Sequence, residues 1–247
     1  MNIGVVPARL DSTRLPRKIL ADLNGKPLVA HVMERALQSK TLDKVILAID
    51  SEETSEALSQ FDFEMTMTSS THVSGTDRIA EVVKEIPDAE IIVNIQGDEP
   101  LIEPDVIDAL VRTFEDNDVN ISTVVSSKLT VSDLLNPNVV KAIVDEKKNA
   151  IEFKRNIFDL EIGGVYRHIG LYGFKRESLF HFTMLDPSTR EMDSNLEQLR
   201  ALDNGMKIRA AVTSYESFSV DTQSDLDKVS RIMESSTVVL NQDIENE

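Results

Sequence analysis

The sequence has no cysteine and no long apolar run. The first absence excludes disulfides, thiolate catalysis and zinc sites built from cysteine, and it favours a cytoplasmic enzyme. No apolar stretch approaches the roughly 18 residues of a membrane-spanning helix, so we expect no membrane span. The short apolar segment Ile3–Ala8 follows no basic segment. It therefore predicts a buried strand and not a signal peptide.

Basic residues are also scarce. The chain has 26 Lys and Arg against 43 Asp and Glu, which gives a net charge of −17. Such a surface would repel a polyanion, so nucleic acid is excluded as a general partner. A small anionic substrate remains compatible with this charge if cations gather locally. Five do so within the first 26 residues: Arg9, Arg14, Arg17, Lys18 and Lys26.

Apolar segments rich in β-formers alternate with amphipathic helical segments through the first half of the chain. This alternation is typical of an α/β fold with a mostly parallel twisted sheet and flanking helices on both faces. Ligands of such sheets bind at the carboxyl ends of the strands. The predicted strands are 3–8, 45–49, 64–68, 91–96 and 121–125, and the predicted helices are 27–39, 52–59, 77–85 and 104–114.

The second half of the chain is less regular. Neither a repeat nor a linker composition divides it, so residues 1–236 predict a single domain. Residues 237–247 lack periodicity and predict a flexible tail. The predicted strands are 139–144, 168–174 and 207–212, and the predicted helices are 176–182, 195–203 and 224–234.

A loop rich in cations and hydroxyl groups follows the first strand. It reads Pro7-Ala8-Arg9-Leu10-Asp11-Ser12-Thr13-Arg14-Leu15-Pro16-Arg17-Lys18. Backbone N–H groups and cationic side chains in such a loop can bind a triphosphate. The spacings of the P-loop and of the G-x-G-x-x-G motif are missing. By itself, the segment fits a solvated basic loop equally well.

Together with four later segments, this loop resembles the 3-deoxy-manno-octulosonate (Kdo) cytidylyltransferases, which belong to the GT-A-like nucleotidyltransferases. Within the loop, the resemblance is carried by Ala8-Arg9, Ser12-Thr13-Arg14-Leu15-Pro16 and Lys18. The later segments stand in the family's order and extend the resemblance over about residues 3–233. They are His72-Val73-Ser74-Gly75-Thr76-Asp77-Arg78, Val93-Asn94-Ile95-Gln96-Gly97-Asp98-Glu99-Pro100, Glu197-Gln198-Leu199-Arg200 and Val220-Asp221-Thr222-Gln223-Ser224-Asp225-Leu226.

The resemblance implies an enzyme that uses CTP and Mg²⁺ to activate an acidic eight-carbon sugar as its CMP derivative for lipopolysaccharide synthesis. It implies a nucleotide half (about 1–125), a sugar-binding and dimerisation elaboration (about 126–215), and a homodimer. Lys18, Arg9 and Asp98 are then the expected catalytic residues. The expected nucleotide-binding residues are Ala8, Arg9, Ser12, Thr13, Lys18, Ser74, Arg78 and Asp98, and the expected sugar-binding residues are Gln96, Arg155, His168, Tyr172, Glu197 and Gln198.

The chemistry of two carboxylates independently indicates a cation site. Asp98 follows an apolar strand, which places it at the ligand edge of the predicted sheet. Mg²⁺ prefers a few carboxylates together with phosphate oxygens and water, so Asp98 and Asp221 are the expected metal ligands. Each also has a structural interpretation, because Asp98 suits a turn and Asp221 suits a helix N-cap.

Other expected site residues have similar alternatives. Thr76 or Asp77 could simply cap the following helix. His168 could be structural in a half-exposed strand, in which alternation places it on the same face as Tyr172. Arg155 suits a bidentate pair with the substrate carboxylate.

The chain departs from the family's pattern at three places. Arg17 replaces a usual glycine, and Lys154-Arg155 replaces a usual Ser-Arg pair. Segment 156–165 replaces a longer loop that contains proline. This short loop carries Asp159 and Glu161. We predict that it favours a Kdo analogue with an 8-amino group, because an ammonium needs an acid or several acceptors when it is desolvated.

The sequence thus predicts a sugar-acid cytidylyltransferase. Two alternatives stay open: activation of another acidic sugar, such as a nonulosonate, and nucleotide sensing without turnover. Sialate-activating relatives usually have Gly-Ser-Lys-Gly in place of Ser12-Thr13-Arg14-Leu15. The presence of Lys18, Asp98 and Asp221 weighs against a loss of turnover.

Overall fold

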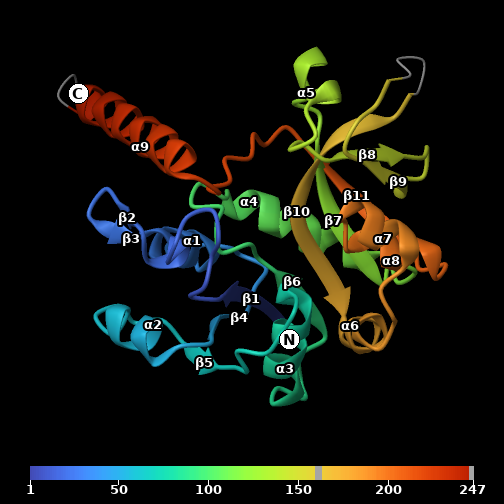
Figure 1. Ribbon diagram of the computed structural model, residues 1–247, viewed down its shortest axis with the longest axis horizontal. Coiled ribbons are helices and arrows are strands. Elements are labelled where there is room, and N and C mark those ends of the chain that lie inside the picture. Colours follow the sequence, from blue (N-terminus) through green and yellow to red (C-terminus); the bar gives the residue numbers. More distant parts are fainter. Residues whose placement is uncertain (159–162, 245–247) are drawn as a thin grey trace.

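The computed structural model describes residues 1–158 and 163–244, in which a nine-stranded twisted sheet carries helices on both faces (Figure 1). The strand order is β5-β4-β1-β6-β10-β7-β11-β9-β8. The strands are β1 (Asn2–Ala8), β4 (Lys44–Ile49), β5 (Met65–Met67), β6 (Ile91–Asn94), β7 (Ile121–Ser126), β8 (Lys141–Val144), β9 (Asn149–Lys154), β10 (Val165–Lys175) and β11 (Ile208–Thr213); β2 (Asp22–Leu23) and β3 (Lys26–Pro27) form a separate small hairpin.

The helices pack their apolar sides on the two faces of the sheet and form two cores. Residues of α1, α4 and α9 contribute to one core, and residues of α3, α6 and α8 contribute to the other. The helices are α1 (Leu28–Ala36), α2 (Glu52–Ala57), α3 (Gly75–Lys84), α4 (Pro104–Arg112), α5 (Val131–Leu135), α6 (Arg176–Thr183), α7 (Thr189–Ser194), α8 (Gln198–Asp203) and α9 (Gln223–Ile244), with short 3₁₀ turns at Lys18–Leu20 and Thr113–Glu115.

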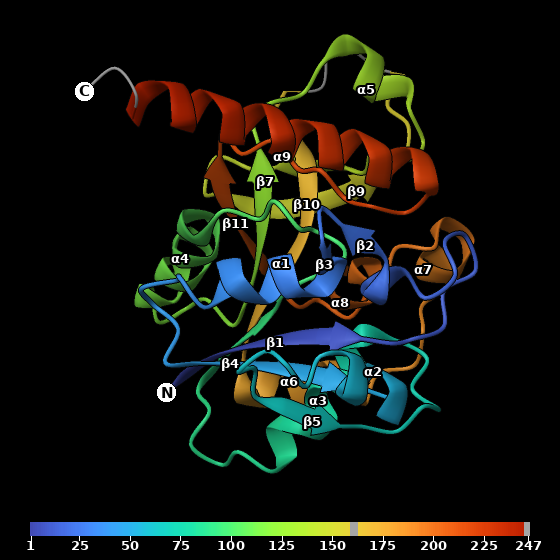
Figure 2. The same cartoon turned by 90° about the vertical axis from the view of Figure 1, so that its left-hand side faces the viewer.

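The apolar alternation of β1 explains how it joins the two cores. Val5 is buried in one core and the next residue, Val6, in the other, because successive side chains of a strand point to opposite faces. β1 pairs in parallel with β4 on one side and with β6 on the other. The carboxyl ends of these three strands therefore meet at one edge of the sheet, and Figure 2 shows β1 and β4 side by side there.

The prediction of a mostly parallel sheet is correct only for the half formed by β5, β4, β1 and β6. In the other half, β7 and β11 are parallel, but β10 pairs antiparallel with β6, β7 and β8, and β9 pairs antiparallel with β8 and β11. β8 and β9 are joined by the short turn 145–148, and strands joined by so short a turn pair antiparallel.

The predicted strands and helices are present, with ends that shift by a few residues, whereas β9, α5 and α7 were not predicted. The last predicted helix, 224–234, is too short, because α9 continues to Ile244 and extends away from the sheet (Figure 1). The chain contains no glycine or proline after Gly205, so the sequence offers no helix breaker there. No helix in the described part of the chain is long and apolar enough to cross a membrane.

Candidate active site

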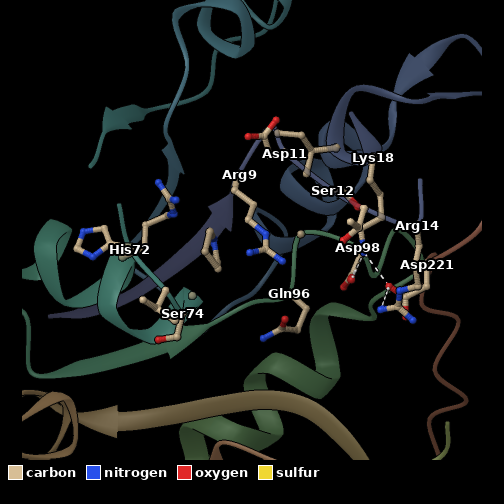
Figure 3. Close-up of a pocket in the computed structure, with 17 residues that line it drawn as sticks. Arg9, Asp11, Ser12, Arg14, Lys18, His72, Ser74, Gln96, Asp98 and Asp221 are labelled. Carbon is tan, nitrogen blue, oxygen red and sulfur yellow. Dashed lines mark hydrogen bonds and ion pairs between the residues drawn. The ribbon is translucent and has the colours of Figure 1, made fainter. Parts of the chain in front are cut away.

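A cleft of about 260 Å³ opens at the carboxyl ends of β1 and β6 (Figure 3). Its walls are formed by the loop after β1, the start of α3, the turn after β6 and Asp221, which lies two residues before α9. The charged residues that line it include four cations, although the chain has a net charge of −17. They are Arg9, Arg14, Lys18, Arg78, Asp11, Asp98 and Asp221.

The structure brings most of the predicted nucleotide and metal residues into this cleft. Gln96, predicted to bind the sugar, also lines it. Ala8 is fully buried at the end of β1, directly before the cleft. Gly97 lies so close to β1 that a Cβ atom there would stand 3.0 Å from the Pro7 carbonyl oxygen. The predicted residues that line the cleft are Arg9, Ser12, Thr13, Lys18, Ser74, Arg78, Gln96, Asp98 and Asp221.

Asp98 and Asp221 converge on one cation. The ammonium Nζ of Lys18 lies 2.6 Å from Asp98 Oδ2 and 3.0 Å from Asp221 Oδ1 (Figure 3). Arg14 donates to the same Asp221 oxygen at 2.9 Å. Burial acts to lower the pKa of Lys18, but the two carboxylates outweigh it and raise the pKa. Lys18 is therefore a permanent ammonium in this site.

Asp221 is not the N-cap residue of α9, although its position suggested that role. The start of α9 is capped by its neighbours: Thr222 Oγ1 accepts from the N–H of Asp225 at 3.3 Å, and the Asp225 carboxylate accepts from the N–H of Thr222 at 2.9 Å. This reciprocal pair is a capping box. The Asp221 carboxylate instead points to Lys18 and Arg14.

The carboxylate pair suits a hard divalent cation. Its two oxygens already lie within hydrogen-bonding distance of one positive charge, the Lys18 ammonium. The described residues contain no cluster of three or more metal-ligating side chains. Mg²⁺ fits such a poor protein ligand set, because it keeps waters and takes further ligands from phosphate oxygens.

Arg9 and Arg17 have different surroundings within the loop after β1. The Arg9 side chain points into the cleft and makes no ion pair within residues 1–158 and 163–244 (Figure 3). Arg17 has φ 56° and pairs with Glu53 of α2, outside the cleft lining. This left-handed backbone explains why a glycine suits the position. The extra cation at Arg17 is thus not part of the cleft.

Asp50 is a site residue that the sequence analysis missed. One of its carboxylate oxygens accepts from the N–H of Leu10 at 3.0 Å, and the other accepts from Arg78 Nη2 at 2.9 Å. Arg78 is only 3% exposed and also donates to Thr68. Asp50 therefore fixes both the loop after β1 and Arg78. Its place directly after an apolar strand, the rule that identified Asp98, could have revealed it.

Ser74 is the N-cap residue of α3, where Thr76 or Asp77 were the alternatives considered. Its hydroxyl accepts from the N–H of Asp77 at 3.1 Å and donates to the Asp77 carboxylate at 3.0 Å. The N-terminus of α3 consequently faces the cleft with a fixed geometry. The adjacent His72 lines the same cleft and is hydrogen-bonded to Glu81.

His168 and Tyr172 share one face of β10, as predicted. Tyr172 Oη lies 2.9 Å from His168 Nε2, which also lies 3.0 Å from Thr123 Oγ1 on β7. Burial lowers the pKa of His168 to about 3 and raises that of Tyr172 above its ordinary value. Both side chains are therefore neutral near pH 7 and offer uncharged hydrogen-bonding groups.

Glu197 and Gln198 line a second, smaller pocket together with Tyr172 and Thr76. Thr76 donates to Glu197 Oε2 at 2.8 Å. Glu197 Oε1 and Gln198 Nε2 are buried and have no hydrogen-bond partner among the described residues. Buried polar atoms without partners are costly, and they are expected where a ligand completes the site.

Arg155 faces away from both pockets. Its guanidinium donates to the carbonyl oxygens of Ser194 at 2.7 Å, Asn195 at 3.0 Å and Pro137 at 3.0 Å. In this arrangement Arg155 fixes the segment that precedes Glu197. Its predicted contact with a substrate carboxylate stays a prediction, and Arg155 lines neither pocket. Asp159 and Glu161, the other acids predicted near the sugar, lie outside the described residues.

Comparisons with known proteins cover most of the chain. A family model described as Cytidylyltransferase matches residues 3–208. The 3-deoxy-manno-octulosonate cytidylyltransferase of Geobacter metallireducens is 44% identical over 242 residues, which cover 92% of this chain and 95% of the relative. The protein of the same name from Chloroherpeton thalassium is 42% identical over 238 residues, which cover 93% of this chain and 96% of the relative.

Solved structures extend the comparison to the fold. CMP:2-keto-3-deoxy-manno-octonic acid synthetase complexed with CTP superposes with a TM-score of 0.90 at 33% identity, covering 96% of this chain and 100% of that chain. The 4-diphosphocytidyl-2C-methyl-D-erythritol synthase of Anaerococcus prevotii gives a TM-score of 0.64 at 14% identity, covering 94% of this chain and 95% of that chain. The second likeness shows a common fold alone.

Proposed function

This chain belongs to the cytidylyltransferase family, and we propose that it transfers CMP from CTP to the anomeric 2-hydroxyl of a 3-deoxy-octulosonate sugar, with release of pyrophosphate. The product would serve lipopolysaccharide synthesis. The observation that carries the proposal is the convergence of Asp98 and Asp221 on one cation at the edge of a cation-lined cleft. The names of the relatives, one of them complexed with CTP, support the choice of substrates.

We assign the triphosphate to the end of the cleft that holds the loop after β1. Arg9 is available there, while Arg14 and Lys18 stand beside the carboxylate pair. These cations would offset negative charge on the phosphates as the bond to the α-phosphorus breaks. The base and ribose would lie toward Ser74 and Arg78 at the start of α3. No covalent intermediate on the protein is required.

We assign Mg²⁺ to Asp98 and Asp221. Bound there, it would lower the pKa of the attacking hydroxyl and offset charge on the triphosphate. Lys18 holds the two carboxylates together in the structure described here, and it would turn to the phosphates when a divalent cation takes its place. The chain's own task is to hold the nucleotide and the hydroxyl in line.

We place the sugar acid between Gln96 and the pocket of Tyr172, Glu197 and Gln198. Glu197 Oε1, which has only a long ion pair with Arg200 at 3.9 Å, and Gln198 Nε2 both lack a hydrogen-bond partner among the described residues, and sugar hydroxyls could supply one. We also propose a cytoplasmic homodimer, as the resemblance to the family implies. The mixed sheet supports the assignment to the GT-A-like group.

CTP should be strongly preferred over UTP, GTP and ATP. A site that pairs with the exocyclic amine and the carbonyl of cytosine leaves buried groups unpaired when another base is bound. The kcat/KM for that other nucleotide should then be about 10⁴-fold lower than for CTP. Pyrophosphate release with each nucleotide, at saturating sugar acid, measures the preference. Equal turnover with UTP would reject the cytidylyl assignment.

The same assay with a panel of sugar acids separates the alternative functions. Faster turnover of a nonulosonate than of Kdo would favour the other acidic sugar. CTP binding without release of pyrophosphate in the presence of any sugar acid would favour a nucleotide sensor. The proposed function requires that pyrophosphate is released from CTP only when a 3-deoxy-octulosonate is present.

The short loop between residues 156 and 165 is predicted to favour the 8-amino analogue of Kdo. The expected result is a higher kcat/KM for the 8-amino sugar than for Kdo, because Asp159 or Glu161 would meet its ammonium. Loss of that preference in Asp159→Asn or Glu161→Gln would identify the acid. A higher kcat/KM for Kdo in the unaltered protein would contradict this prediction.

A further inference from the structure

The two carboxylates of the proposed metal site are carried by segments of different rigidity. Asp98 lies in the turn that follows β6, a strand inside the sheet. Asp221 ends an irregular segment, residues 214–221, that connects β11 to α9. A metal site works only if its ligands stay within ~0.5 Å of the productive geometry. Further contacts must therefore fix the irregular segment against the turn.

Glu99, the neighbour of Asp98, makes these contacts. It is 7% exposed, and its side chain turns away from the cleft toward the irregular segment. Ser217 Oγ donates to Glu99 Oε1 at 2.5 Å, and Tyr215 Oη donates to Glu99 Oε2 at 3.4 Å. We call these two contacts the Glu99 clamp. A buried carboxyl group that accepts a short hydrogen bond from Ser217 and a longer one from Tyr215 links the irregular segment to the turn that holds Asp98.

A backbone hydrogen bond continues the clamp toward the metal site. The N–H of Val220 donates to the carbonyl oxygen of Asp98 at 2.9 Å. Val220 is fully buried and Tyr215 is 5% exposed, so both ends of the segment are packed against the core. The next residue is Asp221, whose carboxylate meets that of Asp98 at Lys18.

From this geometry we infer that Glu99 is a positioning residue, which sets the separation of Asp98 and Asp221 at which the pair binds a divalent cation together with a nucleoside triphosphate. Glu99 acts through Ser217, Tyr215 and the segment that leads to Asp221. The identity of the nucleotide in this inference rests on the proposed function; the clamp itself does not.

The test compares CTP binding with and without Mg²⁺, by calorimetry, in Glu99→Ala, Glu99→Gln and Ser217→Ala. Affinity for CTP in Mg²⁺ should fall about 10-fold or more in Glu99→Ala, as for other residues that support metal ligands, while affinity in EDTA stays close to that of the unaltered protein. Glu99→Gln keeps one acceptor oxygen and should recover part of the loss. Ser217→Ala should show a smaller loss of the same kind.

Glu103→Gln is the matched control. Glu103 is exposed, near Tyr215, and lies outside the Glu99 clamp, so the same charge change should leave CTP binding unaltered. Ser217→Ala removes one hydroxyl from a half-buried residue and decides the question if Glu99→Ala fails to fold. Unchanged Mg²⁺-dependent affinity, or an equal loss in Mg²⁺ and in EDTA, would overturn the inference. Absence of cytidylyl transfer would reject the proposed function and still leave this binding test valid.

Discussion

Asp98→Asn is expected to reduce CMP-sugar formation on the order of 10³-fold, because the proposed cation loses a charged oxygen ligand and the triphosphate loses the charge compensation that the cation supplies. Asp221→Asn should have an effect of similar size. Initial rates of pyrophosphate release over a range of Mg²⁺ concentrations measure both. The fold should persist, because each carboxylate is partly exposed, at 26% and 35%.

A variant in the loop after β1 provides a control for the Asp98 and Asp221 variants. Arg17→Gly removes a cation that lies outside the cleft lining, and glycine accepts the left-handed backbone at that position. Its turnover should stay close to that of the unaltered protein. Near-normal turnover by Asp98→Asn at ordinary Mg²⁺ concentration would remove Asp98 from the metal site.

Lys141→Met is expected to have the largest effect on stability, lowering the free energy of unfolding by about 3 kcal/mol or more. The Lys141 side chain is fully buried, and its ammonium reaches four backbone carbonyls. Methionine fills the same space but leaves those oxygens without a donor. The acceptors are the carbonyls of Asp133, Asn136, Val139 and Arg155.

Urea unfolding followed by circular dichroism measures this loss. Lys154 pairs with Lys141 across the β8–β9 ladder but is exposed, so Lys154→Met should change stability by no more than about 0.5 kcal/mol. Equal urea midpoints for Lys141→Met and Lys154→Met would contradict the prediction, because they would show that the buried Lys141 ammonium stabilises the fold no more than the exposed Lys154 ammonium does.

The first half of the fold could be predicted because most of its strands are apolar segments that alternate with helices. The antiparallel half could not, because pairing between β8, β9 and β10 depends on tertiary contacts that periodicity does not encode. β9 is an example: its burial is irregular, and Ile151 is exposed. The end of α9 was misplaced because residues 237–244 lack a clear apolar period, although they contain no helix breaker.

The site could be predicted where function depends on a residue's type and its place after a strand. Asp98 belongs to this class, whereas Lys18 and Asp221 were identified through the resemblance to the family. Arg155 was assigned to the substrate because an arginine suits a carboxylate, but in the structure its donors face backbone carbonyls. The position of Asp50 after an apolar strand could have placed it at the same edge as Asp98, but its supporting role could not be predicted, because its partners, Leu10 and Arg78, are remote in sequence and become its neighbours only in the folded protein.

The most direct measurement of the central claim follows the phosphorus atoms of CTP. The protein is incubated with Mg²⁺, a 3-deoxy-octulosonate sugar and CTP labelled either at the α- or at the γ-phosphorus, and the products are separated. Cytidylyl transfer predicts that the α-label appears in the CMP-sugar and the γ-label in pyrophosphate. A γ-label on the sugar, an α-label that stays in free nucleotide, or no labelled sugar at all would contradict it.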